Sequence, residues 1–185
     1  MSTGTLIAII VPIVVVLLVC ALAASVIKRR RRLQARFGPE YERTVKAKGS
    51  RRAAERDLRA REQRHDALHI KELPPSARDR YAHEWGQVQE RFVDQPEDAV
   101  HDADRLVTSL MSDRGYPTEG LDQQLSDLSV EHGRTLEHYR AAHEVNRRST
   151  RQEATTEELR GAMVHYRALF TELLHNGQTS RQNGA

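Results

Sequence analysis

Residues 76–111 read SARDRYAHEWGQVQERFVDQPEDAVHDADRLVTSLM, and this stretch predicts two amphipathic helices in succession. In the first, Tyr81, Trp85, Val88 and Phe92 are spaced so that all four lie on one helical face. Ser76 can cap this helix. Asp94-Gln95-Pro96 ends it and begins the next, because proline is favoured in the first turn of a helix. The second helix has its own apolar face, formed by Ala99, Ala103, Leu106, Val107, Leu110 and Met111.

Two further helices are predicted downstream of this pair. Arg114-Gly115-Tyr116-Pro117 is a helix stop, because glycine tolerates the left-handed conformation and proline prevents continuation. The longest helix then follows, and the last begins at Thr155, where Glu158 completes a capping box. Thr150 with Glu153 offers an alternative start for that last helix. The apolar faces are Leu121, Leu125, Leu128, His132, Leu136, Tyr139 and His143, then Leu159, Ala162, Met163, Tyr166, Leu169, Phe170 and Leu173.

The segment upstream of residue 76 is also helical in its pattern, but more polar. Pro39 begins a short helix that Gly49-Ser50 interrupts. Ser50 can cap a second helix that runs to Leu73, where Pro74-Pro75 ends it. Its apolar stripe is thin, so we expect this helix to stay outside the main core. No segment alternates with the period of two that strands require.

These patterns predict an all-α protein in several parts. Four amphipathic helices in residues 76–175 bury one another's apolar faces best as a four-helix bundle. Residues 28–75 form a basic helical stalk, and residues 176–185 form a polar, disordered tail. That leaves the N-terminal part, residues 1–27, which has a different composition.

An uncharged apolar run extends from Leu6 to Ile27, and Lys28-Arg29-Arg30-Arg31-Arg32 follows directly. As a helix, 22 residues are long enough to cross the roughly 30 Å hydrocarbon core of a bilayer. The cations follow the run, so the positive-inside rule places residues 1–5 outside and residues 28–185 in the cytoplasm. The sequence therefore predicts a single-pass protein of the cell membrane with a transmembrane helix at residues 6–27.

A cleaved signal peptide is the alternative interpretation, with Ala21-Leu22-Ala23 as the cleavage site. Signal peptides carry their cations before an apolar core of about 7–15 residues. Here the cations come afterwards and the run is longer, which favours the anchor. Cys20 is the single cysteine, so no disulfide can form within the chain.

The charge of the chain is strongly divided. Residues 28–72 carry 16 Lys or Arg against 7 Asp or Glu, and residues 73–185 carry 13 against 19. An anionic lipid surface attracts each nearby cation by about 1 kcal/mol. We expect the cations next to the membrane to contact lipid headgroups. In the helix predicted from Ser50, acids are interspersed with the basic residues and no aromatic side chain is present to stack on nucleobases, which argues against nucleic acid as a partner. The expected lipid contacts are Lys28, Arg29, Arg30, Arg31, Arg32 and Arg36.

The sequence predicts no catalytic residue, cofactor site or metal site. Glu62 with His65 and Glu172 with His175 have the spacing used in di-iron bundles, but such a site needs two further inward-facing carboxylates. Asp98, His101, Asp102 and Asp104 cluster on one predicted helix and suggest a base with orienting acids, but such a cluster is more often a solvated polar face. None of the glycine-rich or nucleophile motifs of common enzymes occurs.

Several segments resemble an uncharacterised family of small single-pass bacterial membrane proteins. The resemblance covers nearly all of residues 36–174 and implies no activity or ligand. It rests on Arg36-Phe37-Gly38-Pro39-Glu40-Tyr41, Phe92-Val93-Asp94, Ala103-Asp104-Arg105-Leu106-Val107, Arg114-Gly115-Tyr116-Pro117, Asp127-Leu128-Ser129-Val130 and Ala154-Thr155-Thr156-Glu157.

The interpretation that best fits these features is a membrane-anchored helical scaffold that binds a protein partner. The expected partner surface is the acidic group Glu97, Asp98, Asp102 and Asp104. Two alternatives remain open: an enzyme with a polar site in the bundle, and a regulator of a neighbouring membrane complex. The identity of the partner and homo-oligomerisation also remain open.

Overall fold

The computed structural model describes the backbone of residues 3–182 and the side chains of residue 14 and residues 16–175. The regular elements of this part of the chain are all helices, with no strand, which confirms the all-α class. The helices are α1 (Thr3–Phe37), α2 (Pro39–Lys48), α3 (Arg51–Asp66), α4 (Pro75–Arg91), α5 (Pro96–Asp113), α6 (Leu121–Leu128), α7 (Leu136–Ser149) and α8 (Thr156–Gln182).

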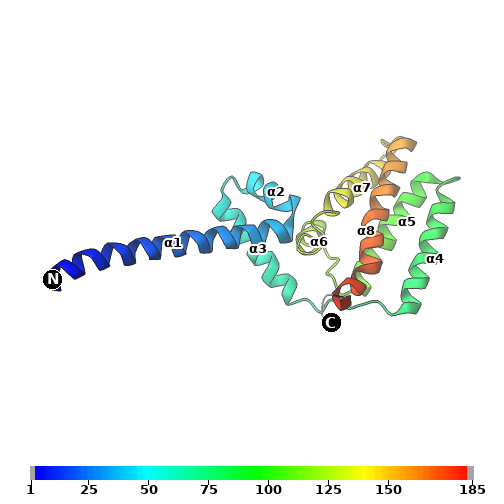
Figure 1. Ribbon diagram of the computed structural model, residues 1–185. Helices are drawn as coiled ribbons and strands as arrows, with labels where there is room; N and C mark the ends of the chain where they lie inside the picture. The colour runs from blue at the N-terminus through cyan, green and yellow to red at the C-terminus, as the bar shows by residue number, and fades with distance from the viewer. Residues whose placement is uncertain (1–2, 183–185) are drawn as a thin grey trace.

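Helices α4, α5, α7 and α8 pack together as a helical bundle, as the apolar faces predict (Figure 1). Helix α8 contacts both α5 and α7, and α4 packs on α5. Most of the predicted apolar face residues are buried in one cluster, which includes Trp85, Leu110, Tyr139 and Tyr166. Phe92 and Leu125 are partly buried against it, whereas Leu121 is exposed. The main core of the molecule is therefore the one that the helical periodicity indicates.

Local sequence signals set several helix ends correctly. The amide of Thr155 donates to Glu158 Oε2 at 2.8 Å, and the amide of Glu158 donates to Thr155 Oγ1 at 3.3 Å. This reciprocal pair is the capping box, and α8 begins directly after Thr155. Gly115 has the predicted positive φ, 92°, after the end of α5. By contrast, Ser50 precedes α3 without a side-chain capping bond, and α4 begins at Pro75, one residue before the predicted cap Ser76.

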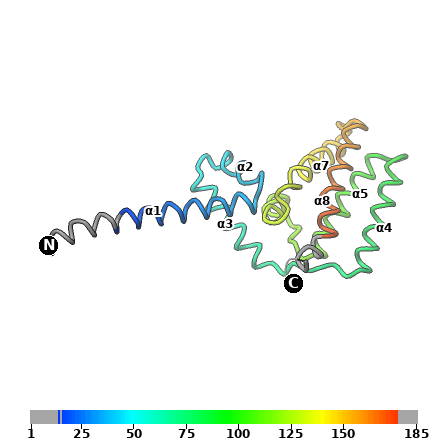
Figure 2. The backbone as a smooth tube through the Cα atoms, viewed as in Figure 1, coloured from blue at the N-terminus to red at the C-terminus, as the bar shows by residue number. Residues whose placement is uncertain are grey.

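The prediction of one long helix from Leu121 through His143 is wrong, because a turn at residues 129–135 separates α6 from α7. Within this turn the backbone of Gly133 lies against the end of α1. A Cβ atom at Gly133 would stand 2.5 Å from the carbonyl oxygen of Phe37 and 3.1 Å from that of Ser129. Contact with α1, which is distant in the sequence, therefore accompanies the break (Figure 2).

The helix predicted to reach Leu73 instead ends at Asp66, and residues 69–74 are non-helical. The amide of Lys71 donates to the carbonyl of Arg114 at 2.8 Å. A Cβ atom at Gly115 would stand 2.5 Å from the carbonyl oxygen of His69, so the two segments lie in close contact. The bonds that would continue the helix are thus replaced by bonds to the turn after α5.

The first three helices form a small core of their own instead of an extended stalk. Leu33 and Phe37 of α1, Tyr41 of α2 and Leu58 of α3 are buried together with Val130 of the α6–α7 turn. Leu68 and Ile70, which follow α3, pack against the main core. The thin apolar stripe of α3 is therefore covered by other parts of the fold, and the basic segment packs against the bundle.

The N-terminal part of α1 extends away from the rest of the molecule (Figure 1). Of the apolar run Leu6–Ile27, residues 6–13 and 15 lie outside the described side chains. The side chains of the predicted disordered tail, residues 176–185, also lie outside them, but the described backbone of residues 176–182 continues α8 as a helix. Among the residues that are described, no helix combines the length and the hydropathy that a membrane crossing requires.

Candidate functional site

The four carboxylates predicted as a partner surface lie on α5 but do not form one free acidic face. Glu97 and Asp98 lie in its first turn and are exposed, where the helix dipole favours negative charge. The carboxylate of Asp102 is paired with the guanidinium groups of Arg91 and Arg105. Asp104 is turned toward the bundle. Only Glu97 and Asp98 therefore remain available to a partner.

Asp104 connects three helices. Its Oδ1 accepts a hydrogen bond from Tyr166 of α8 at 2.8 Å and lies 3.3 Å from Nδ1 of His143 on α7. Burial, together with the charge of Asp104, raises the pKa of the Tyr166 hydroxyl. The hydrogen bond to Asp104 raises the pKa of His143. Asp104 thus holds α5, α7 and α8 together and is not part of a free surface.

An open depression of about 430 Å³ lies beside this group. It contains the polar set that the sequence suggests as a base with orienting acids. Among the described hydrogen bonds, however, none joins His101 to Asp98 or Asp102. These side chains therefore line a solvated surface without the oriented acid–base pair that proton transfer requires. The depression is lined by Arg91, Asp98, His101, Asp102, Asp104, Arg105 and Asn146.

A second polar group, which we call the polar junction, consists of Tyr116, Glu131, His132, Thr135 and Glu172. Nδ1 of His132 lies 2.8 Å from Glu172 Oε1, and its Nε2 lies 3.2 Å from the hydroxyl of Tyr116. Thr135 donates to the other oxygen of Glu172 at 2.6 Å. Hydrogen bonds to His132 and Thr135 lower the pKa of Glu172 although burial opposes this. Both ring nitrogens of His132 are thus occupied.

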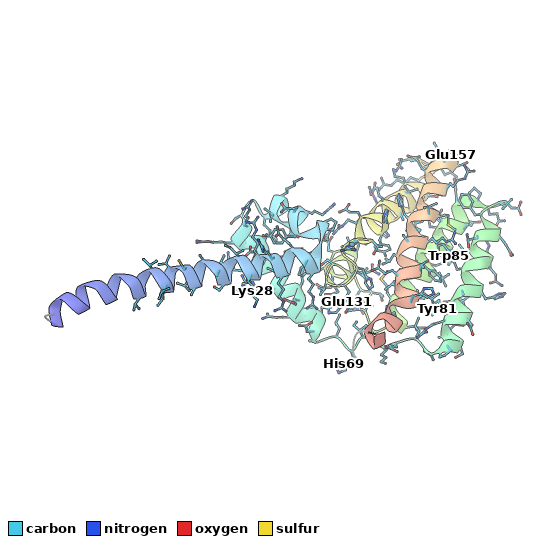
Figure 3. The ribbon with its side chains drawn as sticks, in the orientation of Figure 1. Lys28, His69, Tyr81, Trp85, Glu131 and Glu157 are labelled. Atoms are coloured by element: carbon cyan, nitrogen blue, oxygen red, sulfur yellow. The ribbon has the colours of Figure 1, made fainter. Side chains whose placement is uncertain are left out.

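The polar junction also reaches the N-terminal helices. Tyr116 donates to Glu131 at 3.0 Å, and Nε2 of His65 on α3 lies 3.7 Å from the same carboxylate. Figure 3 shows Glu131 between the N-terminal helices and the bundle. His132 is fully buried, so no substrate reaches its ring in this conformation. The junction therefore joins two parts of the fold and is not an accessible catalytic site.

The sequence identifies only part of this junction. It places His132 on an apolar stripe and Glu172 in a possible metal pair, but it does not connect the two residues. Glu131 and Thr135 carry no signal of their own, because their roles depend on the turn that breaks the predicted long helix. The nearest signal is Arg114-Gly115-Tyr116-Pro117, which brings Tyr116 back onto the bundle.

The cations predicted to contact lipid differ in their surroundings. Arg32 and Arg36 of α1 both pair with Glu62 of α3, at 2.9 and 2.7 Å, and Arg36 also lies 3.3 Å from Asp66. Arg30 is half-buried, near Tyr41. Lys28, Arg29 and Arg31 are exposed and have no ion-pair partner among the described residues. These last three are the cations free to meet another surface.

The histidine and carboxylate pairs with metal-ligand spacing do not come together. Glu62 is paired with arginines of α1, and Glu172 is bonded to His132. Within the described part of the chain, no three His, Cys, Asp or Glu side chains are grouped as a metal site requires.

Comparisons with protein-family models, with curated proteins and with solved structures find no match to this chain. The resemblance to small single-pass bacterial membrane proteins therefore stays a prediction from the quoted segments.

Proposed function

We propose that this chain is a membrane-anchored helical interaction module: Leu6–Ile27 crosses the cell membrane, and the bundle binds a protein partner on the cytoplasmic side. The observation that carries the proposal is the surface of α1. Its described aliphatic side chains from Val14 to Ile27 are 52–63 % exposed. Each square ångström of apolar surface left in water costs about 25 cal/mol. A helix with aliphatic side chains on all sides is stable where lipid surrounds it.

The charges that follow the apolar run support this orientation. Lys28, Arg29 and Arg31 are exposed directly after Ile27, where headgroups of an anionic leaflet would meet them. Arg32 and Arg36 are engaged by acids of α3 instead, which fixes the body of the protein to the end of the membrane helix. The anchor and the body would therefore move as one unit.

The body itself supports binding more than catalysis. Its core is filled, and the buried histidine with a carboxylate partner, His132, is enclosed. The exposed carboxylates that remain available, such as those of Glu97 and Asp98, are suited to contact with a protein partner. We therefore propose a scaffold whose recognition surface lies on the bundle.

Membrane insertion is tested with two matched double variants of the full chain. Val16→Arg with Val19→Arg places two charges in the apolar run, at about 2.5–3.5 kcal/mol each near the centre of a membrane helix. Val93→Arg with Val164→Arg makes the same change at two exposed valines of the body. The parent chain and the Val93→Arg, Val164→Arg variant should stay in the membrane during alkaline carbonate treatment and float with vesicles. The Val16→Arg, Val19→Arg variant should be extracted by carbonate.

Orientation and processing are measured on the same membranes. A C-terminal fusion to a reporter that works only in the cytoplasm should be active, and a fusion to one that works only outside the cytoplasm should be inactive. N-terminal sequencing should find the apolar run intact. Extraction of the parent by carbonate, or a mature N-terminus near Ala24, would contradict the anchor.

A further inference from the structure

An open groove of about 210 Å³ lies between α4 and α8. These helices are on the side of the body away from the N-terminal end of α1 (Figure 1). The walls of the groove are mainly apolar, with Trp85 and Phe92 on one side and Met163 and Val164 on the other. Arg160 and Arg167 of α8 complete the lining, together with Gln89.

The lining has the chemistry of a protein-binding surface. Aromatic residues, methionine and arginine are the residue types enriched at protein interfaces. Arg160 pairs with Glu157, whereas Arg167 has no ion-pair partner among the described residues. The indole N–H of Trp85 is buried without a hydrogen-bond acceptor. An occupant of the groove should therefore present an apolar side chain together with negative charge.

The chain itself presents such a segment at the turn between α4 and α5. Val93 is 81 % exposed, the highest value among the described large apolar side chains. Asp94, Glu97 and Asp98 follow it, are exposed, and form no ion pair within the described residues. Because Val93 comes directly after Phe92, which lines the groove, the acidic turn and the groove belong to the same end of the bundle.

We propose that the occupant is a second copy of this chain, in a two-fold dimer in which the acidic turn of each copy enters the groove of the other. An isologous interface of this kind uses the same surface on both partners, so each contact forms twice. The attraction runs between Asp94 and Glu97 of one copy and Arg160 and Arg167 of the other. The proposal rests on the proposed function, because a shared membrane orients the copies and raises their effective concentration.

Charge reversal with rescue tests the pairing in the full chain, purified in a mild non-ionic detergent with two different tags. The groove variant is Arg160→Glu with Arg167→Glu, and the turn variant is Asp94→Arg with Glu97→Arg. Each alone should weaken co-purification of the two tagged forms by about tenfold or more. A mixture of the two variants should restore it, because every reversed charge then meets its opposite. Arg147→Glu with Arg151→Glu, two exposed arginines at the end of α7 and after it, is the control and should change nothing.

Cysteine crosslinking tests the geometry without altering charge. In a Cys20→Ser background, a chain with Val93→Cys is mixed with a differently tagged chain with Val164→Cys. Mild oxidation should join the two through a disulfide, and circular dichroism checks that all variants remain folded. Glu157→Gln should strengthen association, because it releases Arg160 and removes a like charge near the incoming acids.

The outcomes separate this interface from the membrane anchor. A parent chain that floats with vesicles but shows neither co-purification nor the crosslink would overturn the dimer alone. Association that persists in both reversed variants would place the contact on another surface and also overturn it. A monomeric parent that binds an acidic peptide would assign the groove to a different partner. A dimer with the predicted rescue in a chain that does not float would retain the interface and reject the anchor.

Discussion

Two histidines on the same predicted stripe have different surroundings. His132 lies in the α6–α7 turn, fully buried, between Glu172 and Tyr116. His143 lies on α7, half-exposed, beside Asp104. Each of the two rings therefore has a hydrogen-bonding partner within the fold. The pKa of His143 is shifted upward, which links its protonation to the stability of the fold.

The stabilisation supplied by His143 should depend on pH. Its pKa lies above the ordinary value of 6.5, chiefly because of the hydrogen bond to Asp104. The folded protein therefore holds the proton more tightly than the unfolded chain does. The contribution is fully present below pH 6.5 and is lost as the pH rises through the folded-state value. His143→Gln should thus destabilise the protein more at pH 5.5 than at pH 8.5, as measured by urea unfolding.

His165 provides the control for this measurement. Burial and the neighbouring His138 lower its pKa, so its contribution has the opposite sign. His165→Gln should remove a stabilisation that is present at high pH and lost as the pH falls. Equal effects of His143→Gln at both pH values would show that its bond to Asp104 does not favour the charged ring.

At the scale of an element, α4 shows how one helix contributes both to the core and to a surface. Its stripe buries Tyr81, Trp85 and Val88. The ring of Trp85 stacks on Phe170 of α8, with centroids 4.7 Å apart. Figure 3 shows both Tyr81 and Trp85 on this helix. The hydroxyl of Tyr81 reaches Asp113 at 2.7 Å, which ties the start of α4 to the end of α5.

Truncation of Trp85 should be strongly destabilising. Trp85→Ala removes a buried ring and leaves a cavity, at a cost of about 3–5 kcal/mol in the free energy of unfolding. Trp85→Phe is the matched variant: it keeps an aromatic ring against Phe170 and removes an N–H that has no acceptor. Its cost should be clearly smaller. A loss below about 0.5 kcal/mol for Trp85→Ala would contradict the assignment of this stripe to the core.

At the scale of the whole molecule, two hydrophobic clusters are held together by polar contacts. The guanidinium of Arg140 on α7 pairs with Glu40 of α2, whose side chain is 1 % exposed. Nearby, Arg43 of α2 pairs with Glu137 of α7 at 2.6 Å, with both side chains about half exposed. Together with the polar junction, these pairs fix the basic N-terminal helices onto the bundle.

These two pairs should differ greatly in their effect on stability. Arg140→Ala leaves the buried carboxylate of Glu40 without its counter-charge, which costs about 3–5 kcal/mol. Arg43→Ala breaks an exposed pair and should cost at most about 1 kcal/mol. Urea unfolding of the two variants measures the difference, and proteolysis of the segment between α3 and α4 should accelerate in Arg140→Ala only. Similar small losses in both variants would mean that Glu40 is solvated and that the two clusters are not joined through it.

The helical class, the apolar faces of α4, α5 and α8, and one of the two candidate starts of α8 were predictable from the sequence. Each depends on interactions within one or two turns of helix, as the capping box of Thr155 and Glu158 illustrates. The apolar run of α1 and its cations are likewise properties of a continuous segment. From these local patterns follow the all-α fold and the proposal of an anchor.

The break between α6 and α7, the burial of Glu40, the bonds of Asp104 to other helices, and the groove beside the acidic turn were decided only in three dimensions. Gly133 meets Phe37, and Arg140 meets Glu40 across 100 residues of chain. Helical periodicity and capping patterns cannot predict such contacts, because the local sequence around each of these residues resembles that around an exposed polar residue. The free energy that distinguishes them comes from desolvation and pairing, which exist only once distant helices have packed together.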